Sequence, residues 1–94
     1  MTNSVDSTVT ARFAEVCDQL ADILAGVLDV DESEIERDKD FFEMGGSSVL
    51  VPEVAHQVSS AFGITATSTL LYENPVIDEL ADAIIELKEQ NLPQ

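Results

Sequence analysis

The residues best placed for chemistry are two serines that follow two glycines in the middle of the chain. Gly45 and Gly46 give a backbone that turns freely and can be approached closely. Ser48 stands at the start of an apolar helical pattern, so we expect its hydroxyl at a helix N-terminus. A phosphate on that hydroxyl would meet unpaired N–H groups and the positive end of the helix dipole. The segment therefore predicts a phosphodiester site that a modifying enzyme can reach.

Other interpretations compete for the same residues. Taken alone, Gly-Gly-Ser-Ser is more typical of a turn followed by an ordinary N-cap. A hydrolase nucleophile elbow requires Gly-x-Ser-x-Gly, and Leu50 stands where the last glycine should be. His56 follows Ser48 by about two helical turns, too far for a direct hydrogen bond. An enzyme is therefore the function class that these residues support least.

An acidic run from Asp29 to Asp40 has some features of a calcium-binding loop, with carboxylate or hydroxyl oxygens at odd positions. However, Glu34 replaces the glycine of the sixth position and Glu36 the apolar residue of the eighth. Asp40 also replaces the final glutamate. A solvated acidic loop explains the run better than a metal site does.

The elements that must position the two serines begin with a long amphipathic helix. Apolar residues step by three and four over about 8–28, and Asp6, Ser7 or Thr8 could serve as the N-cap. Cys17 lies beside the apolar stripe and is expected to be a small core residue. The long stretch that follows has no helical period, apart from one plausible turn near 31–35. Its apolar residues could fix it to the bundle; they are Val30, Ile35, Phe41, Phe42 and Met44.

Three further helical segments follow this loop. One begins at Ser48 and ends at Gly63, with Pro52 in its first turn, where a missing N–H is tolerated. A short helix over Leu70–Tyr72 is capped by Thr67 or Ser68. In the last, Asn74 is the N-cap and Pro75 the first helical residue of a pattern that continues to about Lys88. The pattern predicts an all-α domain without strands, with residues 91–94 frayed.

Composition limits the possible partners. The 94 residues form one domain, 1–94, with a folded core over about 8–89. Nineteen acidic residues against four basic ones give a formal net charge of −15. Such a field repels nucleic acid and anionic membrane surfaces and attracts basic protein faces. No nucleic acid and no membrane are therefore expected as partners, and the protein is expected to be a monomer.

The cellular setting follows from what the sequence lacks. Cys17 is the single cysteine, so no internal disulfide can form and a reducing compartment is favoured. The first ten residues do not resemble a secretory leader, and no stretch has the apolar length of a membrane span. We expect a soluble, cytoplasmic protein. Met1 favours a free-standing one, although an excised domain could be cloned to look the same.

Two segments at a suitable separation resemble the peptidyl and acyl carrier proteins. The first, 40–50 (DFFEMGGSSVL), has an aromatic pair and Gly-Gly before a serine that aliphatic residues follow. The second, 71–81 (LYENPVIDELA), is similar to the start of the family's last helix. Helix order, the long first loop and total length agree over about 13–87. The resemblance implies a four-helix carrier-protein bundle with three principal helices, one short helix and a long first loop.

This resemblance implies a covalent cofactor. A separate phosphopantetheinyl transferase, using magnesium, would join 4′-phosphopantetheine from coenzyme A to the serine that aligns with Ser48. Gly45, Gly46 and Ser47 would lie beside the attachment point. Ser47 stands where the family often has His or Asp, but the aliphatic pair after Ser48 favours Ser48 as the modified residue. The thiol of the arm, and not Cys17, would carry the cargo as a thioester.

The resemblance also implies the partners. An adenylation enzyme or acyltransferase would load the carrier, condensation or other tailoring enzymes would use the cargo, and a thioesterase would release it. The sequence of segment 40–50 looks more like that of the peptidyl carrier proteins of natural-product biosynthesis. Aminoacyl or peptidyl cargo is therefore preferred, and polyketide acyl cargo stays open. The protein would have no catalytic activity of its own.

Partner contacts are expected near the start of the second helix. Val49, Val51 and Pro52 are the candidates, with Val51 and Pro52 on the exposed side of that helix next to Glu53. Docking there should depend more on apolar contact than on charge. The competing function is a non-covalent interaction module, an acidic helical bundle that binds a basic protein or calcium and is never modified.

Overall fold

The computed structural model describes residues 4–90 of the chain, with side chains from 12 to 89. This part is helical and contains no strand. The helices are α1 (Ser4–Leu28), η1 (Glu32–Glu34), η2 (Phe41–Met44), α2 (Val51–Phe62), α3 (Ser68–Glu73) and α4 (Ile77–Gln90), where η1 and η2 are 3₁₀ turns of the first loop. The predicted bundle of three principal helices and one short helix is confirmed. The predicted fraying of 91–94 concerns residues outside the described part.

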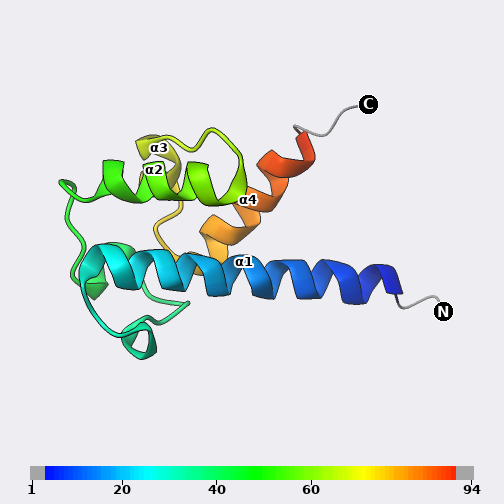
Figure 1. The fold of residues 1–94 in the computed structure, drawn as a ribbon, viewed down its shortest axis with the longest axis horizontal. Coiled ribbons are helices and arrows are strands. Elements are labelled where there is room, and N and C mark those ends of the chain that lie inside the picture. Colours follow the sequence, from blue (N-terminus) through cyan, green and yellow to red (C-terminus); the bar gives the residue numbers. More distant parts are fainter. Residues whose placement is uncertain (1–3, 91–94) are drawn as a thin grey trace.

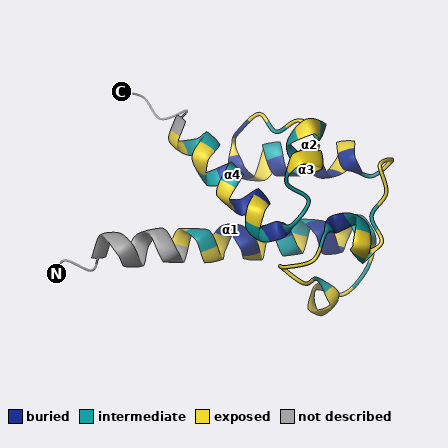
Figure 2. Cartoon of the chain, turned by 180° about the vertical axis from the view of Figure 1, so that it is seen from behind, coloured by how far each residue is buried: buried dark blue, intermediate teal, exposed yellow. Residues whose placement is uncertain are grey.

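The helices pack around an aliphatic core. Figure 1 shows α2 alongside α1 with the opposite chain direction, and α4 packs on α1 while α3 contacts both α2 and α4. The buried faces meet between the helices, with exposed residues on the outer faces (Figure 2). The largest fully buried side chains are Phe41, Leu20, Leu24, Ile77, Ile84, Val51, Val54, Val58 and Cys17. Removing each such aliphatic or aromatic side chain from water stabilises the fold by about 1.5–3 kcal/mol.

The first helix has the predicted apolar face but a different start. Val16, Leu20 and Leu24 are buried at helical spacing, as the periodicity indicated. The helix begins at Ser4, and Asp6, Ser7 and Thr8 lie within it. The predicted N-cap at one of those three residues is therefore wrong.

The second helix begins later than the sequence predicted. Residues 48–50 form a turn in which the Leu50 N–H donates to the Ser47 carbonyl (3.0 Å) and the Val51 N–H to the Ser48 carbonyl (3.3 Å). α2 starts at Val51 with Pro52 in its first turn. Pro52 has no N–H to donate to the Ser48 carbonyl, so an α-helical hydrogen bond cannot form there. The helix ends as predicted at Gly63, which has φ +66°.

The start of the last helix also differs from the prediction. Asn74 follows α3 as its C-cap, and its side-chain amide donates to the Leu70 carbonyl (3.0 Å). α4 begins only at Ile77, so Asn74 and Pro75 are not its N-cap and first residue. The side chain of Thr67 does accept a hydrogen bond from the Leu70 N–H (3.3 Å), which confirms the predicted cap of α3. Within residues 4–90, no helix is long and apolar enough to cross a bilayer.

Candidate functional site

The Gly-Gly-Ser-Ser segment connects η2 to α2 and lies on the surface. Ser47 and Ser48 are both exposed, so exposure does not distinguish between them. Ser48 lies three residues before α2, in the turn described above. A group attached to its hydroxyl would extend into solvent from the N-terminal end of that helix.

The hydrogen bonds around this turn correct one part of the phosphate prediction. The N–H groups of Leu50 and Val51 already donate to carbonyls of the turn, and Pro52 has none. The expectation that a phosphate on Ser48 meets unpaired N–H groups is therefore wrong for residues 50–52. The helix dipole still favours negative charge at this end of α2.

The two glycines have separate structural roles. Gly45 has φ +103° and ends η2, a conformation that side chains with a Cβ rarely adopt. Gly46 lies against the ring of Phe41, where an added Cβ would come within 2.3 Å of the ring carbon Cε2. The first glycine turns the chain, and the second lets the chain pass over a core side chain.

Phe41 fixes this segment to the bundle. Its side chain is fully buried, and its N–H donates to the Pro75 carbonyl (2.8 Å). Asp40 pairs with Val76 in an isolated antiparallel bridge. The two segments that carry the family resemblance, 40–50 and 71–81, are therefore in direct contact.

A capping box orders η2 just before the glycines. The Asp40 carboxylate accepts from the Phe42 N–H (2.7 Å), and the Glu43 carboxylate accepts from the Asp40 N–H (3.4 Å). The Phe42 ring packs edge-on to the Phe41 ring, with 5.1 Å between the ring centroids. It also stacks on the Tyr72 ring, with 6.0 Å between the centroids and 12° between the ring planes. The first loop is thereby connected to α3. These contacts confirm Phe41 and Phe42 as anchors of the loop.

The candidate partner contacts differ in exposure. Val49 is 82% exposed, the most exposed large apolar side chain among those described, and Tyr72 is 50% exposed. Pro52 is also exposed. Val51, in contrast, is fully buried, so the prediction that it lies on the exposed side of the helix is wrong. The late start of α2 turns Val51 into the core and leaves Val49 outside.

Charge around the site is uneven. The loop from Asp29 to Glu43 exposes most of its carboxylates, and its two cations are in ion pairs. Arg37 Nε lies 3.0 Å from Asp78 Oδ1, and Lys39 Nζ lies 3.3 Å from Glu36 Oε2. The first turn of α2 carries only Glu53. The exposed surface beside Ser48 is thus acidic on the loop side and largely uncharged on the α2 side.

Two other candidates from the sequence have structural explanations. Cys17 is fully buried, and burial, more than its carboxylate neighbour Asp78, raises the pKa of its thiol to about 11. His56 is exposed on α2. In the part of the chain with described side chains, no three His, Cys, Asp or Glu residues are grouped to hold a metal ion.

Sequence comparison places this geometry among known proteins. Residues 18–84 match the sequence profile of the phosphopantetheine attachment site. The chain is 36% identical over 67 residues to phosphinothricin tripeptide synthetase PhsB of Streptomyces viridochromogenes, a match that covers 71% of the chain and 6% of that protein. It also matches atromentin synthetase greA of Suillus grevillei, with 32% identity over 83% of the chain. The chain spans no more than 8% of the length of these synthetases.

Comparison with solved structures agrees with these sequence matches. The HMG-ACPI domain from the CurA module of Lyngbya majuscula superposes with a TM-score of 0.76 and 27% identity, covering 85% of this chain and 82% of that domain. A chain from the complex of the phosphopantetheine transferase Sfp with coenzyme A and a peptidyl carrier protein superposes with a TM-score of 0.69 and 31% identity. That match covers 76% of this chain and 90% of the other. The protein therefore belongs to the phosphopantetheine attachment-site family of acyl and peptidyl carrier proteins.

Proposed function

We propose that Ser48 is the residue that bears the 4′-phosphopantetheine arm, and that the chain carries aminoacyl, peptidyl or acyl groups on it during natural-product biosynthesis. The observation that carries this proposal is the position of Ser48: it is exposed, in the turn that leads into α2, and two residues after Gly46, which packs against the buried ring of Phe41. The family profile spans this segment. When bound, the arm supplies a terminal thiol that holds cargo as a thioester.

The residues around Ser48 fit such a group. Ser48 is exposed, and the positive end of the α2 dipole favours a phosphodiester on its hydroxyl. In the modification, Ser48 Oγ attacks the β-phosphorus of coenzyme A. The phosphoanhydride bond to the 3′-phospho-AMP portion breaks, this nucleotide leaves as adenosine 3′,5′-bisphosphate, and the transferase accepts the serine proton. His56, the single histidine of the chain, lies eight residues after Ser48 on α2, too far along the helix to act as its base.

The partners proposed here follow from the family and from the exposed surface. A phosphopantetheinyl transferase modifies Ser48, an adenylation enzyme or acyltransferase loads the thiol, and condensation, tailoring and thioesterase enzymes use it. Val49 and Pro52 supply the apolar contact beside the attachment point. The chemistry belongs to these enzymes and not to the carrier. Aminoacyl cargo, a single carrier domain over 1–94 and a cytoplasmic location are part of the proposal.

Intact-mass spectrometry tests the attachment directly. The protein is incubated with coenzyme A, magnesium and a broad-specificity phosphopantetheinyl transferase, beside Ser48→Ala and Ser47→Ala variants. We expect a gain of one phosphopantetheine in the wild type and in Ser47→Ala, and none in Ser48→Ala. If Ser47→Ala alone abolished the gain, the attachment site would be wrong. If several transferases left the wild type unmodified, covalent carriage itself would be refuted and a non-covalent interaction module would be the better account.

A further inference from the structure

A hollow of about 530 Å³ lies at the end of α2 that is farther from Ser48, between α1, the turn after α2 and the end of α4. Its floor is formed by the buried side chains of Val16, Phe62 and Ile64. Arg12, Glu15, Gln19, Ala61 and Gly63 are exposed around it, and Lys88 is half-buried. The volume falls within the range of about 300–1,000 Å³ that is typical of binding pockets.

Two of the four cations in the chain line this hollow. The other two, Arg37 and Lys39, are in ion pairs with carboxylates of the fold. Among the described side chains, Arg12 and Lys88 are in no such pair, and Glu15 is the one carboxylate that lines the hollow. The chain has a formal net charge of −15, and within residues 12–89 its unpaired Arg and Lys side chains lie at this hollow.

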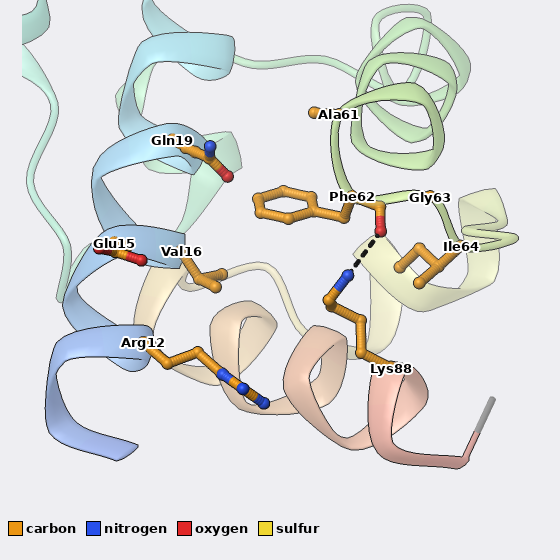
Figure 3. A pocket seen from close by; sticks show the side chains of 9 residues that line it. All are labelled: Arg12, Glu15, Val16, Gln19, Ala61, Phe62, Gly63, Ile64 and Lys88. Carbon is orange, nitrogen blue, oxygen red and sulfur yellow. Dashed lines mark hydrogen bonds between the residues drawn. The ribbon is translucent and has the colours of Figure 1, made fainter. Parts of the chain in front are cut away.

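The position of Lys88 is fixed by the fold. Its Nζ donates to the Phe62 carbonyl at 3.0 Å, at the C-terminal end of α2, where the helix dipole is negative. An ammonium group has three donors, so two remain for a ligand. Figure 3 shows Lys88 reaching this carbonyl from α4 and Arg12 projecting from α1, with the side chains of Val16 and Phe62 on the same side of both. The two cations therefore lie beside an apolar floor.

We propose that this hollow binds an acidic segment of a partner protein, with an aliphatic side chain on the floor and a carboxylate on Arg12 and Lys88. An apolar anchor inside a polar rim is the arrangement found at the centre of protein interfaces. The exposed rim suits a segment laid across it better than an enclosed small ligand. A basic segment would be drawn instead to the exposed acidic loop 29–43.

This contact is independent of the attachment site. The twelve residues of α2 separate the two regions by about 17 Å of helix. A partner held in the hollow leaves the Ser48 surface open to a second enzyme. The inference therefore does not require Ser48 to be modified, and it assigns the carrier a second docking surface that carries positive charge.

A titration followed by ¹H–¹⁵N NMR of the whole chain tests the proposal. The probe is the capped peptide acetyl-Glu-Leu-Leu-Glu-amide, and the matched controls replace both Glu by Lys or both Leu by Gly. We expect the acidic probe to shift the amides of Val16, Gly63, Ile64 and Lys88 in a saturable way, and both controls to bind at least about fivefold more weakly. Equal shifts of these amides by the basic peptide, or shifts confined to other regions, would overturn the proposal.

Charge reversal at the rim gives a second measurement. Arg12→Glu should weaken binding of the acidic probe by about fivefold or more. Lys39→Glu makes the same charge change in the acidic loop and should alter the affinity by less than about twofold. Because Arg12 and Lys39 are both exposed, neither variant should change helix content by circular dichroism. Equal losses of affinity in the two variants would mean that net charge, and not the hollow, governs binding.

Discussion

The ring of Phe41 lies against Gly46 so closely that no side chain can be added at that glycine without displacing the ring. Phe41 is fully buried and its N–H donates to Pro75, which lies just before α4. The backbone before Ser48 is therefore positioned by the core and by a segment some thirty residues further along the chain. The glycine is required for close packing as well as for turning.

Replacing Gly46 with alanine should destabilise the fold. The new Cβ would lie 2.3 Å from Phe41 Cε2, and the buried ring has little room to move. Overpacking of this kind costs about 1–3 kcal/mol. Urea unfolding followed by circular dichroism measures the loss.

Gly26→Ala is the matched control for that measurement. Gly26 lies within α1, and an added Cβ there would meet nothing within 4 Å. Alanine favours the helix, so the substitution should stabilise the protein by up to about 1 kcal/mol. Equal stability of Gly46→Ala and the wild type would show that the Phe41 contact does not constrain the segment.

Replacing Val49 or Val51 with aspartate should affect different properties of the protein. Val49 is 82% exposed, so Val49→Asp should leave the unfolding free energy within about 0.5 kcal/mol of the wild type while slowing transferase modification by about tenfold. Val51 is fully buried, and Val51→Asp places a carboxylate in the core at a cost of several kcal/mol. Thermal unfolding and modification rates separate the two effects. An unchanged modification rate in Val49→Asp would remove this residue from the partner surface.

Local patterns predicted the helices well where local forces decide. Leu20 and Leu24 are buried at the predicted spacing, Gly63 ends α2 in the left-handed conformation, and Thr67 caps α3. The start of α2 is three residues later than the pattern predicts, because Pro52 cannot donate to the Ser48 carbonyl. Val51, expected on the exposed side of the helix, is buried.

Contacts between distant segments could not be predicted in this way. Asn74-Pro75 has the composition of a helix start, but Asn74 ends α3 and Pro75 accepts from Phe41 across the bundle. The contact between Phe41 and Gly46 also depends on how the first loop folds back. The attachment segment itself was identified from the sequence because its residues are contiguous, while the hollow between Arg12 and Lys88 is assembled from three elements and leaves no local signal.

Removing the carboxylate of Asp40 should loosen η2. This side chain accepts from the Phe42 N–H at 2.7 Å, and Asp40→Ala should lower the unfolding free energy by about 1 kcal/mol. Asp40→Asn keeps a side-chain oxygen and should recover most of the loss. Asp38→Ala, at an exposed position of the same loop, is the control for charge alone. If Asp38→Ala and Asp40→Ala were equally destabilising in thermal unfolding, the cap would contribute nothing.

The buried thiol of Cys17 should make stability depend on pH in the alkaline range. Burial is the main reason that its pKa rises from 9.0 to about 11, and the thiol also donates a hydrogen bond to Asp78 Oδ1, with 3.7 Å between sulfur and oxygen. The folded state therefore keeps its proton at a pH where the unfolded chain has lost it. Stability is unaffected by this group below about pH 9 and falls as the pH rises from about 9 to about 11.

Comparing the wild type with Cys17→Ala isolates this effect, because lysine and tyrosine titrations are common to both proteins. At pH 7 the variant should be less stable by about 1 kcal/mol, since a small buried side chain is shortened. Between pH 9 and pH 11 the wild type should lose on the order of 2 kcal/mol more than the variant, so the difference should shrink and then reverse. Urea midpoints at pH 7, 9, 10 and 11 measure the two curves. Parallel curves would show that the thiol titrates alike in the folded and unfolded chains.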